Sequence, residues 1–298
     1  MAEQENPVFG RKVFFLNLSS DLRNQIIDPL REREYEVFNI DDYKSAKAIL
    51  RNFPDAICFV QVDIHGSNQL KTNQWFNFLH SFQSDPVLKT IYLGVITKRM
   101  TTSEQNFFML NLLLPAGLLS IRNGTDELFD NLINILEVNG AKGRRQYVRA
   151  KCPENSRAVV RCKIADVTVI MTINDISSVG ISCYIKNNQT QLFKPNIVLE
   201  NISFSINSAT SFHCNAAVFT VKPFNNQYSL LVLLLMKGTT RAVKTEIRQY
   251  IFNILEHEIQ KKVQNIPLDA TEYSEKIDLQ ADEGFLLDAN ETEETETV

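Results

Sequence analysis

Two arginines in the middle of the chain have the spacing of a ligand-binding pair. Arg145 and Arg149 form an RxxxR run, so their side chains share a face whether the segment is helical or extended. A guanidinium group donates two parallel hydrogen bonds to phosphate oxygens or to O6 and N7 of guanine, and it also stacks flat on a base. Arg144 adds a further cation beside them. The run therefore indicates a site for a nucleotide that carries phosphates.

A second run, a short distance along the chain, supplies the groups that arginine lacks. Asp175, Ser177 and Gly180 form a DxSxxG pattern. A carboxylate here can accept hydrogen bonds from the N–H groups of a guanine edge, which distinguishes guanine from adenine. The glycine offers either a left-handed backbone or a bare backbone that a ligand can approach closely. Each run alone is common in solvated segments and turns, but the two in order favour a guanine-nucleotide site.

The elements that must position these residues fall into two classes. From residue 12 to about 139, short apolar runs alternate with segments of helical periodicity, which predicts a doubly wound α/β domain with a parallel sheet of flavodoxin-like type. The runs expected to form its strands are 13–18, 35–39, 56–62, 90–96 and 117–121.

From residue 149 to about 235 the helical pattern disappears. Six strand-like runs separated by turn residues predict a small antiparallel β-barrel; they are 158–162, 167–173, 180–185, 197–206, 213–221 and 228–236. Residues 239–264 then form one amphipathic helix, expected to lie on the barrel or on the first domain through the stripe Val243, Ile247, Ile251, Leu255 and Ile259.

The expected organisation has five parts. Gly140 and Gly143 break the last helix of the first domain, so the boundary falls beside the arginines. The acidic composition of the C-terminal segment predicts a disordered tail. The expected parts are an N-terminal tail (1–11), the α/β domain (12–139), a hinge carrying RxxxR (140–148), the barrel with its helix (149–265) and the acidic tail (266–298).

Composition excludes several classes of function. Among 298 residues, 44% are hydrophobic and 22% charged, as in folded proteins, and the net charge of −4 argues against a general nucleic-acid binder. The five cysteines contain no CxxC pair, so we expect no metal site. The longest apolar run, 230–236, is too short to cross a bilayer, and no signal-peptide pattern is present. We therefore expect a cytoplasmic protein without membrane insertion.

The two runs also carry a family resemblance. The segment from Arg144 to about Gln260 resembles a PilZ domain, a small β-barrel that binds the bacterial second messenger cyclic di-GMP. The resemblance implies an RxxxR on a flexible segment leading into the first strand and a DxSxxG at the start of a barrel strand. The glycine that such domains commonly carry near the last strand is absent from 227–233. The residues implied to bind cyclic di-GMP are Arg145 and Arg149, which would grip guanine and phosphate, Asp175, Ser177 and Gly180 on the barrel side, and the additional Arg144.

The first domain resembles a response-regulator receiver. Asp63 closes the third predicted strand, where a phospho-accepting aspartate would lie, and Thr97 matches the usual hydroxyl. The acidic pair needed to hold Mg²⁺ is replaced by 17–20 (Asn-Leu-Ser-Ser), and Arg122 stands where a lysine is expected. A receiver-like interaction domain is therefore favoured over a phosphorylated one.

These patterns together predict a cyclic di-GMP effector rather than an enzyme. No P-loop, nucleophile elbow or HExxH motif is present, so we expect no catalytic residue and no cofactor. The ligand is expected to change the arrangement of the domains and to signal to an unidentified protein partner in motility or virulence, without binding nucleic acid. Two alternatives stay open: a PilZ-like interaction scaffold that binds no nucleotide, and a phospho-switched response regulator.

Overall fold

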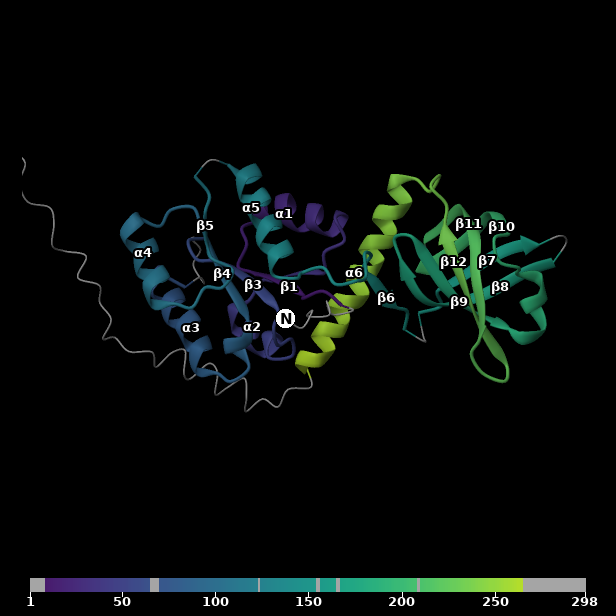
Figure 1. Ribbon diagram of the computed structural model, residues 1–298, viewed down its shortest axis with the longest axis horizontal. Helices are drawn as coiled ribbons and strands as arrows, with labels where there is room; N and C mark the ends of the chain where they lie inside the picture. The colour runs from purple at the N-terminus through teal and green to yellow at the C-terminus, as the bar shows by residue number, and fades with distance from the viewer. Residues whose placement is uncertain are drawn as a thin grey trace, which may run out of the picture.

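The computed structural model describes residues 9–64, 70–122, 124–153, 156–164, 167–207 and 210–264. It contains a parallel sheet with helices, followed by an antiparallel barrel and a long final helix (Figure 1). The predicted fold class is confirmed. The acidic tail predicted over 266–298 lies outside the described residues.

The first domain is built on a five-stranded parallel sheet in the order β2-β1-β3-β4-β5. This order is the flavodoxin-like form of the doubly wound fold. The central strands are buried along their whole length, because helices cover both faces of the sheet. The strands are β1 (Val13–Leu16), β2 (Val37–Ile40), β3 (Ile57–Gln61), β4 (Tyr92–Thr97) and β5 (Leu118–Ser120).

The helices of this domain pack on opposite faces of the sheet. One apolar cluster joins α1 and α5 to the sheet through residues such as Ile26 and Leu132. Another joins α2, α3 and α4 to the other face through residues such as Leu50, Trp75 and Phe108. The helices are α1 (Ser20–Glu32), α2 (Tyr43–Leu50), α3 (Thr72–Ser84), α4 (Thr102–Asn111) and α5 (Thr125–Val138), with a 3-10 turn η1 (Leu88–Thr90).

The second domain is a closed barrel. Its strands follow the order β6-β8-β7-β10-β11-β12-β9, and pairing of β8 with β9 closes the ring. The short strand β6, which the sequence did not predict, adds to β8 and begins at Arg149. The elements are β6 (Arg149–Lys151), β7 (Val159–Ile164), β8 (Val167–Ser177), β9 (Gly180–Lys186), η2 (Asn187–Leu192), β10 (Val198–Asn207), β11 (Thr210–Pro223) and β12 (Tyr228–Leu235).

The final helix α6 (Arg241–Gln264) lies between the two domains (Figure 1). On the side of the first domain, the ring of Phe252 meets Phe38 edge-on, and the Arg31 guanidinium stacks on it at 4.1 Å. On the side of the barrel, α6 packs against β6 and β8. The predicted stripe is mostly buried, but Tyr250, Phe252 and Ile254 are buried as well. The helix thus contacts both of the bodies that the sequence offered as alternatives.

Candidate functional site

A β-bulge near the end of β8 turns the second motif outward. Val169, Met171 and Ile173 alternate into the barrel core, and strict alternation would place Asp175 there too. The register instead shifts between Ile173 and Asp175, and the next buried apolar residue is Ile176. A bulge inserts one residue and re-aims the side chains that follow it. Asp175 therefore lies on the outer side of the barrel wall.

Strand β6 brings the arginine motif to the same place. Its antiparallel pairing with β8 sets Arg149 opposite Ser177 and Lys151 opposite Asp175. The Arg149 guanidinium lies 3.6 Å from Asp175 Oδ1. The side chains keep 42% and 22% of their surface exposed, so both remain accessible to a ligand. The two motifs thus meet across one β ladder.

The DxSxxG run spans a hairpin instead of opening a strand. Asp175 and Ser177 end β8, whereas Gly180 begins β9, which corrects the placement implied by the family resemblance. Ser177 Oγ accepts from the Gly180 N–H and donates to the Gly180 carbonyl, both at 3.1 Å. Ser177 is only 1% exposed. Its hydroxyl therefore holds the turn closed.

Gly180 is needed by the barrel itself. A Cβ atom at this position would lie 2.9 Å from the carbonyl oxygen of Leu233 in β12. The sequence offered two explanations for this glycine: a left-handed backbone, or a bare backbone that another group approaches closely. The structure fits the second, and the group that approaches Gly180 is the backbone of β12. Of the predicted set, Ser177 and Gly180 thus shape the hairpin, and Arg145, Arg149 and Asp175 present functional groups.

A polar network that the sequence reasoning missed holds the Asp175 carboxylate. The side-chain amide of Asn174 donates to Asp175 Oδ2 at 3.1 Å and to Ser182 Oγ at 3.0 Å. The Tyr184 hydroxyl donates to Asn174 Oδ1 at 2.7 Å. The signal available in the sequence was the polar character of Asn174 near the end of one predicted strand and of Ser182 and Tyr184 in the next. These bonds fix the direction in which Asp175 points.

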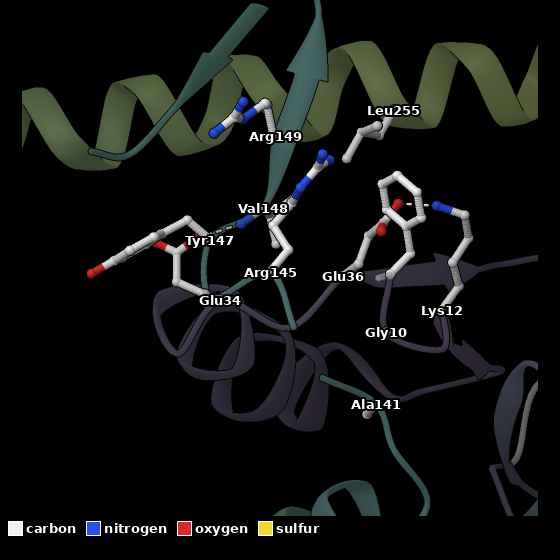
Figure 2. Close-up of a pocket in the computed structure, with 11 residues that line it drawn as sticks. Gly10, Lys12, Glu34, Glu36, Ala141, Arg145, Tyr147, Val148, Arg149 and Leu255 are labelled. Atoms are coloured by element: carbon white, nitrogen blue, oxygen red, sulfur yellow. Dashed lines mark hydrogen bonds and ion pairs between the residues drawn. The ribbon is translucent and has the colours of Figure 1, made fainter. Parts of the chain in front are cut away.

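A cavity of about 190 Å³ lies where the linker (residues 139–148) meets the first domain and α6. Arg145 and Arg149 line it, together with Lys12 and Leu255 (Figure 2). Lys12 is paired with Glu36, and the Arg145 guanidinium lies 4.6 Å from the centre of the Phe9 ring. Arg144 is exposed and is not one of the lining residues. The two arginines of the motif therefore share one cavity, and Arg144 lies outside it.

Glu34 also lines this cavity, and the sequence reasoning missed it. Its carboxylate accepts from the backbone N–H of Val148, which lies between the two arginines, and from the hydroxyl of Ser178 in the hairpin. The visible signal was weak: an acidic residue at a helix end where glycine or asparagine is usual.

Asp63, at the position where a receiver would carry its phospho-accepting aspartate, makes local hydrogen bonds. Asp63 Oδ2 accepts from the hydroxyl of Thr97, at 2.9 Å, and from the backbone N–H groups of Lys98 and Arg99. Asn17, where an acidic residue would be needed, donates to the backbone carbonyl of Gln61. The Asp63 contacts tie the end of β3 to the end of β4, and the Asn17 contact ties the end of β1 to β3.

Metal-binding clusters and membrane-spanning helices are both absent from the part of the chain that the structure describes. No group of three or more His, Cys, Asp or Glu side chains there could hold a metal ion. No helix in that part of the chain is long and apolar enough to cross a membrane.

No family model and no curated protein matches the chain. Among solved structures, the complex of K. pneumonia MrkH with c-di-GMP is 15% identical with a TM-score of 0.37, over 40% of this chain and 55% of MrkH. The PilZ domain of YcgR from Escherichia coli with c-di-GMP is 18% identical with a TM-score of 0.36, over 41% of this chain and 99% of that one. PlzA of Borreliella burgdorferi in complex with c-di-GMP is 15% identical with a TM-score of 0.29, over 42% and 54%. The chain thus spans about half the length of MrkH and PlzA.

Proposed function

We propose that this chain is a cyclic di-GMP receptor that signals by rearranging its two domains. The observation that supports this most is the β6–β8 ladder, which sets Arg149 opposite Ser177 and 3.6 Å from Asp175. Two motifs that are separate in sequence become one surface with cations on one side and a carboxylate on the other.

The proposed roles follow from the chemistry of each group. Arg145 and Arg149 bind phosphate oxygens and the O6 and N7 edge of guanine. Asp175 accepts from the opposite, N–H-bearing edge of guanine. Ser177 and Gly180 hold the hairpin that presents Asp175, and Arg144 adds positive charge at the rim. None of these roles is catalytic.

The size of the cavity supports a rearrangement on binding. Sites that enclose a drug-sized ligand usually measure about 300–1,000 Å³, whereas the cavity between the arginines and the first domain measures about 190 Å³. Asp175 is not one of the residues that line this cavity, so a dinucleotide that contacts Asp175 as well as both arginines extends beyond it. We propose that the linker moves away from the first domain when such a ligand binds. We propose that segments 12–139 and 149–265 act as separate domains and that 140–148 is the hinge between them. The changed arrangement is then recognised by a protein partner.

Calorimetric titration of the purified chain with cyclic di-GMP tests the proposal. The expected result is saturable heat that is lost or weakened about ten- to hundredfold in Arg149→Ala, because one charge-assisted contact contributes about 1.5–3 kcal/mol. The matched control is Arg161→Ala, whose guanidinium contacts Ser205 on the barrel wall, away from the motifs. Absence of heat with the unaltered chain would favour the interaction scaffold that binds no nucleotide.

A further inference from the structure

Glu34 occupies a backbone conformation that its residue type does not favour. It follows α1 with a φ of 63°, the left-handed region that glycine and asparagine adopt readily and other residues adopt at a cost. The side chain is 11% exposed although it carries a charge. The contacts of the carboxylate must therefore offset the free-energy cost of the left-handed backbone and of the buried charge.

Those contacts join three separate parts of the molecule. Oε2 accepts from the Val148 N–H at 3.0 Å, and Oε1 accepts from the Ser178 hydroxyl at 2.6 Å. The Arg248 guanidinium of α6 lies 3.6 Å from Oε1. One carboxylate of the first domain thus holds the linker, the barrel hairpin and the helix between the domains.

Both hydrogen-bond donors lie inside the ligand-binding motifs. Val148 lies between Arg145 and Arg149, and Ser178 lies between Ser177 and Gly180. Any movement that draws the arginines around a ligand must carry the Val148 N–H with it. The linker is also held on the first domain by the Arg11 N–H, which donates to the Gly140 carbonyl at 3.1 Å.

We propose that Glu34 is a latch of the first domain that holds the linker and the hairpin in the arrangement of this structure and thereby lowers the affinity for the dinucleotide. Resting on the proposed function, this inference assigns the coupling between the binding site and the first domain to one carboxylate. Ligand binding breaks the Glu34 contacts, so the observed affinity is reduced by the free energy that holds the latch closed. The negative charge of Glu34 in the cavity also opposes the arrival of phosphate groups.

The test uses the full chain with Glu34→Ala and Glu34→Gln. The matched control is Glu32→Ala, because Glu32 pairs with Arg241 of α6 across the same interface but contacts neither motif. In the absence of ligand, amide hydrogen exchange at Val148 should become faster in Glu34→Ala and stay unchanged in Glu32→Ala. Calorimetry with cyclic di-GMP should show binding about three- to thirtyfold tighter in Glu34→Ala, with Glu34→Gln in between. A merely damaged fold would weaken binding.

Several results would overturn the latch. Unchanged exchange at Val148 in Glu34→Ala would show that the carboxylate does not hold the linker. Equal or weaker affinity in Glu34→Ala, with normal binding by the unaltered chain, would overturn the latch but leave the proposed function in place. Absence of binding by the unaltered chain would overturn the proposed function together with the effect on affinity, and the exchange at Val148 would still decide whether Glu34 holds the linker.

Discussion

The guanidinium of Arg149 lies 3.6 Å from the carboxylate of Asp175, across the ladder between β6 and β8. The two groups proposed to bind opposite parts of a dinucleotide thus form an ion pair with each other. A ligand that binds both the guanidinium and the carboxylate must break this ion pair. The pair is partly exposed, so separating it costs at most about 1 kcal/mol.

Asp175→Asn should weaken cyclic di-GMP binding about tenfold and leave stability nearly unchanged. The amide keeps the shape of the carboxylate but loses the charge that accepts from guanine. The change in the free energy of unfolding should stay below about 1 kcal/mol, because the ion pair with Arg149 is partly solvated. Calorimetry and urea unfolding measure the two effects, and Glu200→Gln, at an exposed position of β10, is the control. Equal affinity in the variant and the unaltered chain would remove Asp175 from the site.

Gly180→Ala should destabilise the barrel by about 1–3 kcal/mol, because its Cβ atom would lie 2.9 Å from the Leu233 carbonyl oxygen. Gly238→Ala is the matched control. A Cβ atom there meets nothing within 4 Å, so its effect should stay within about 0.5 kcal/mol. Urea unfolding of both variants checks the difference. Equal stability would mean that β9 and β12 can separate at no cost.

Stability should fall as the pH rises from about 9 towards 11. Burial raises the pKa of the Cys152, Cys162 and Cys214 thiols to about 11, against 9.0 for a free thiol. As the pH rises, the unfolded chain therefore loses these protons before the folded chain does. The contribution of the thiols to the free energy of unfolding is complete below pH 9 and is lost as the pH rises through the folded-state pKa. Urea unfolding across this range measures the slope. Cys162→Ala should flatten it, and an unchanged slope would argue against burial of that thiol.

Phe252→Ala should destabilise the interface between α6 and the first domain by about 3–5 kcal/mol. The change removes a ring that is 1% exposed, that meets Phe38 edge-on and that carries the Arg31 guanidinium on its face. Gln260→Ala, on the exposed side of the same helix, is the control. Thermal unfolding should separate the two variants clearly. If Phe252→Ala is as stable as the control, α6 is held mainly by its contacts with the barrel and not by those with the first domain.

The strands could be predicted because their apolar runs are local signals. The bulge in β8 was not predicted, because the predicted strand ended at residue 173. The spacing of three between the apolar residues Ile173 and Ile176, which breaks the period of two, is its trace in the sequence. The pairing of β6 with β8 could not be predicted, because a strand as short as Arg149–Lys151 has no pattern of its own. Its register comes from the barrel that it joins.

Contacts between distant segments explain what else the sequence did not show. Glu34 and Ser178 are 144 positions apart and meet only because α6 holds the domains together. The reason for Gly180 lies in the Leu233 carbonyl of another strand. The predicted apolar stripe on α6 was incomplete because the helix packs against both domains, and a helix that is buried on two sides has no single apolar face.

The central claim is that Arg145, Arg149 and Asp175 form a site for a guanine dinucleotide. The most direct measurement is a calorimetric titration of the full chain with cyclic di-GMP and, in parallel, with cyclic di-AMP, which has the same phosphates and different bases. We predict saturable heat with cyclic di-GMP and binding at least about a hundredfold weaker with cyclic di-AMP, because the site's carboxylate would face a base that lacks the matching N–H groups. No heat with cyclic di-GMP, or equal affinity for both dinucleotides, would contradict the account.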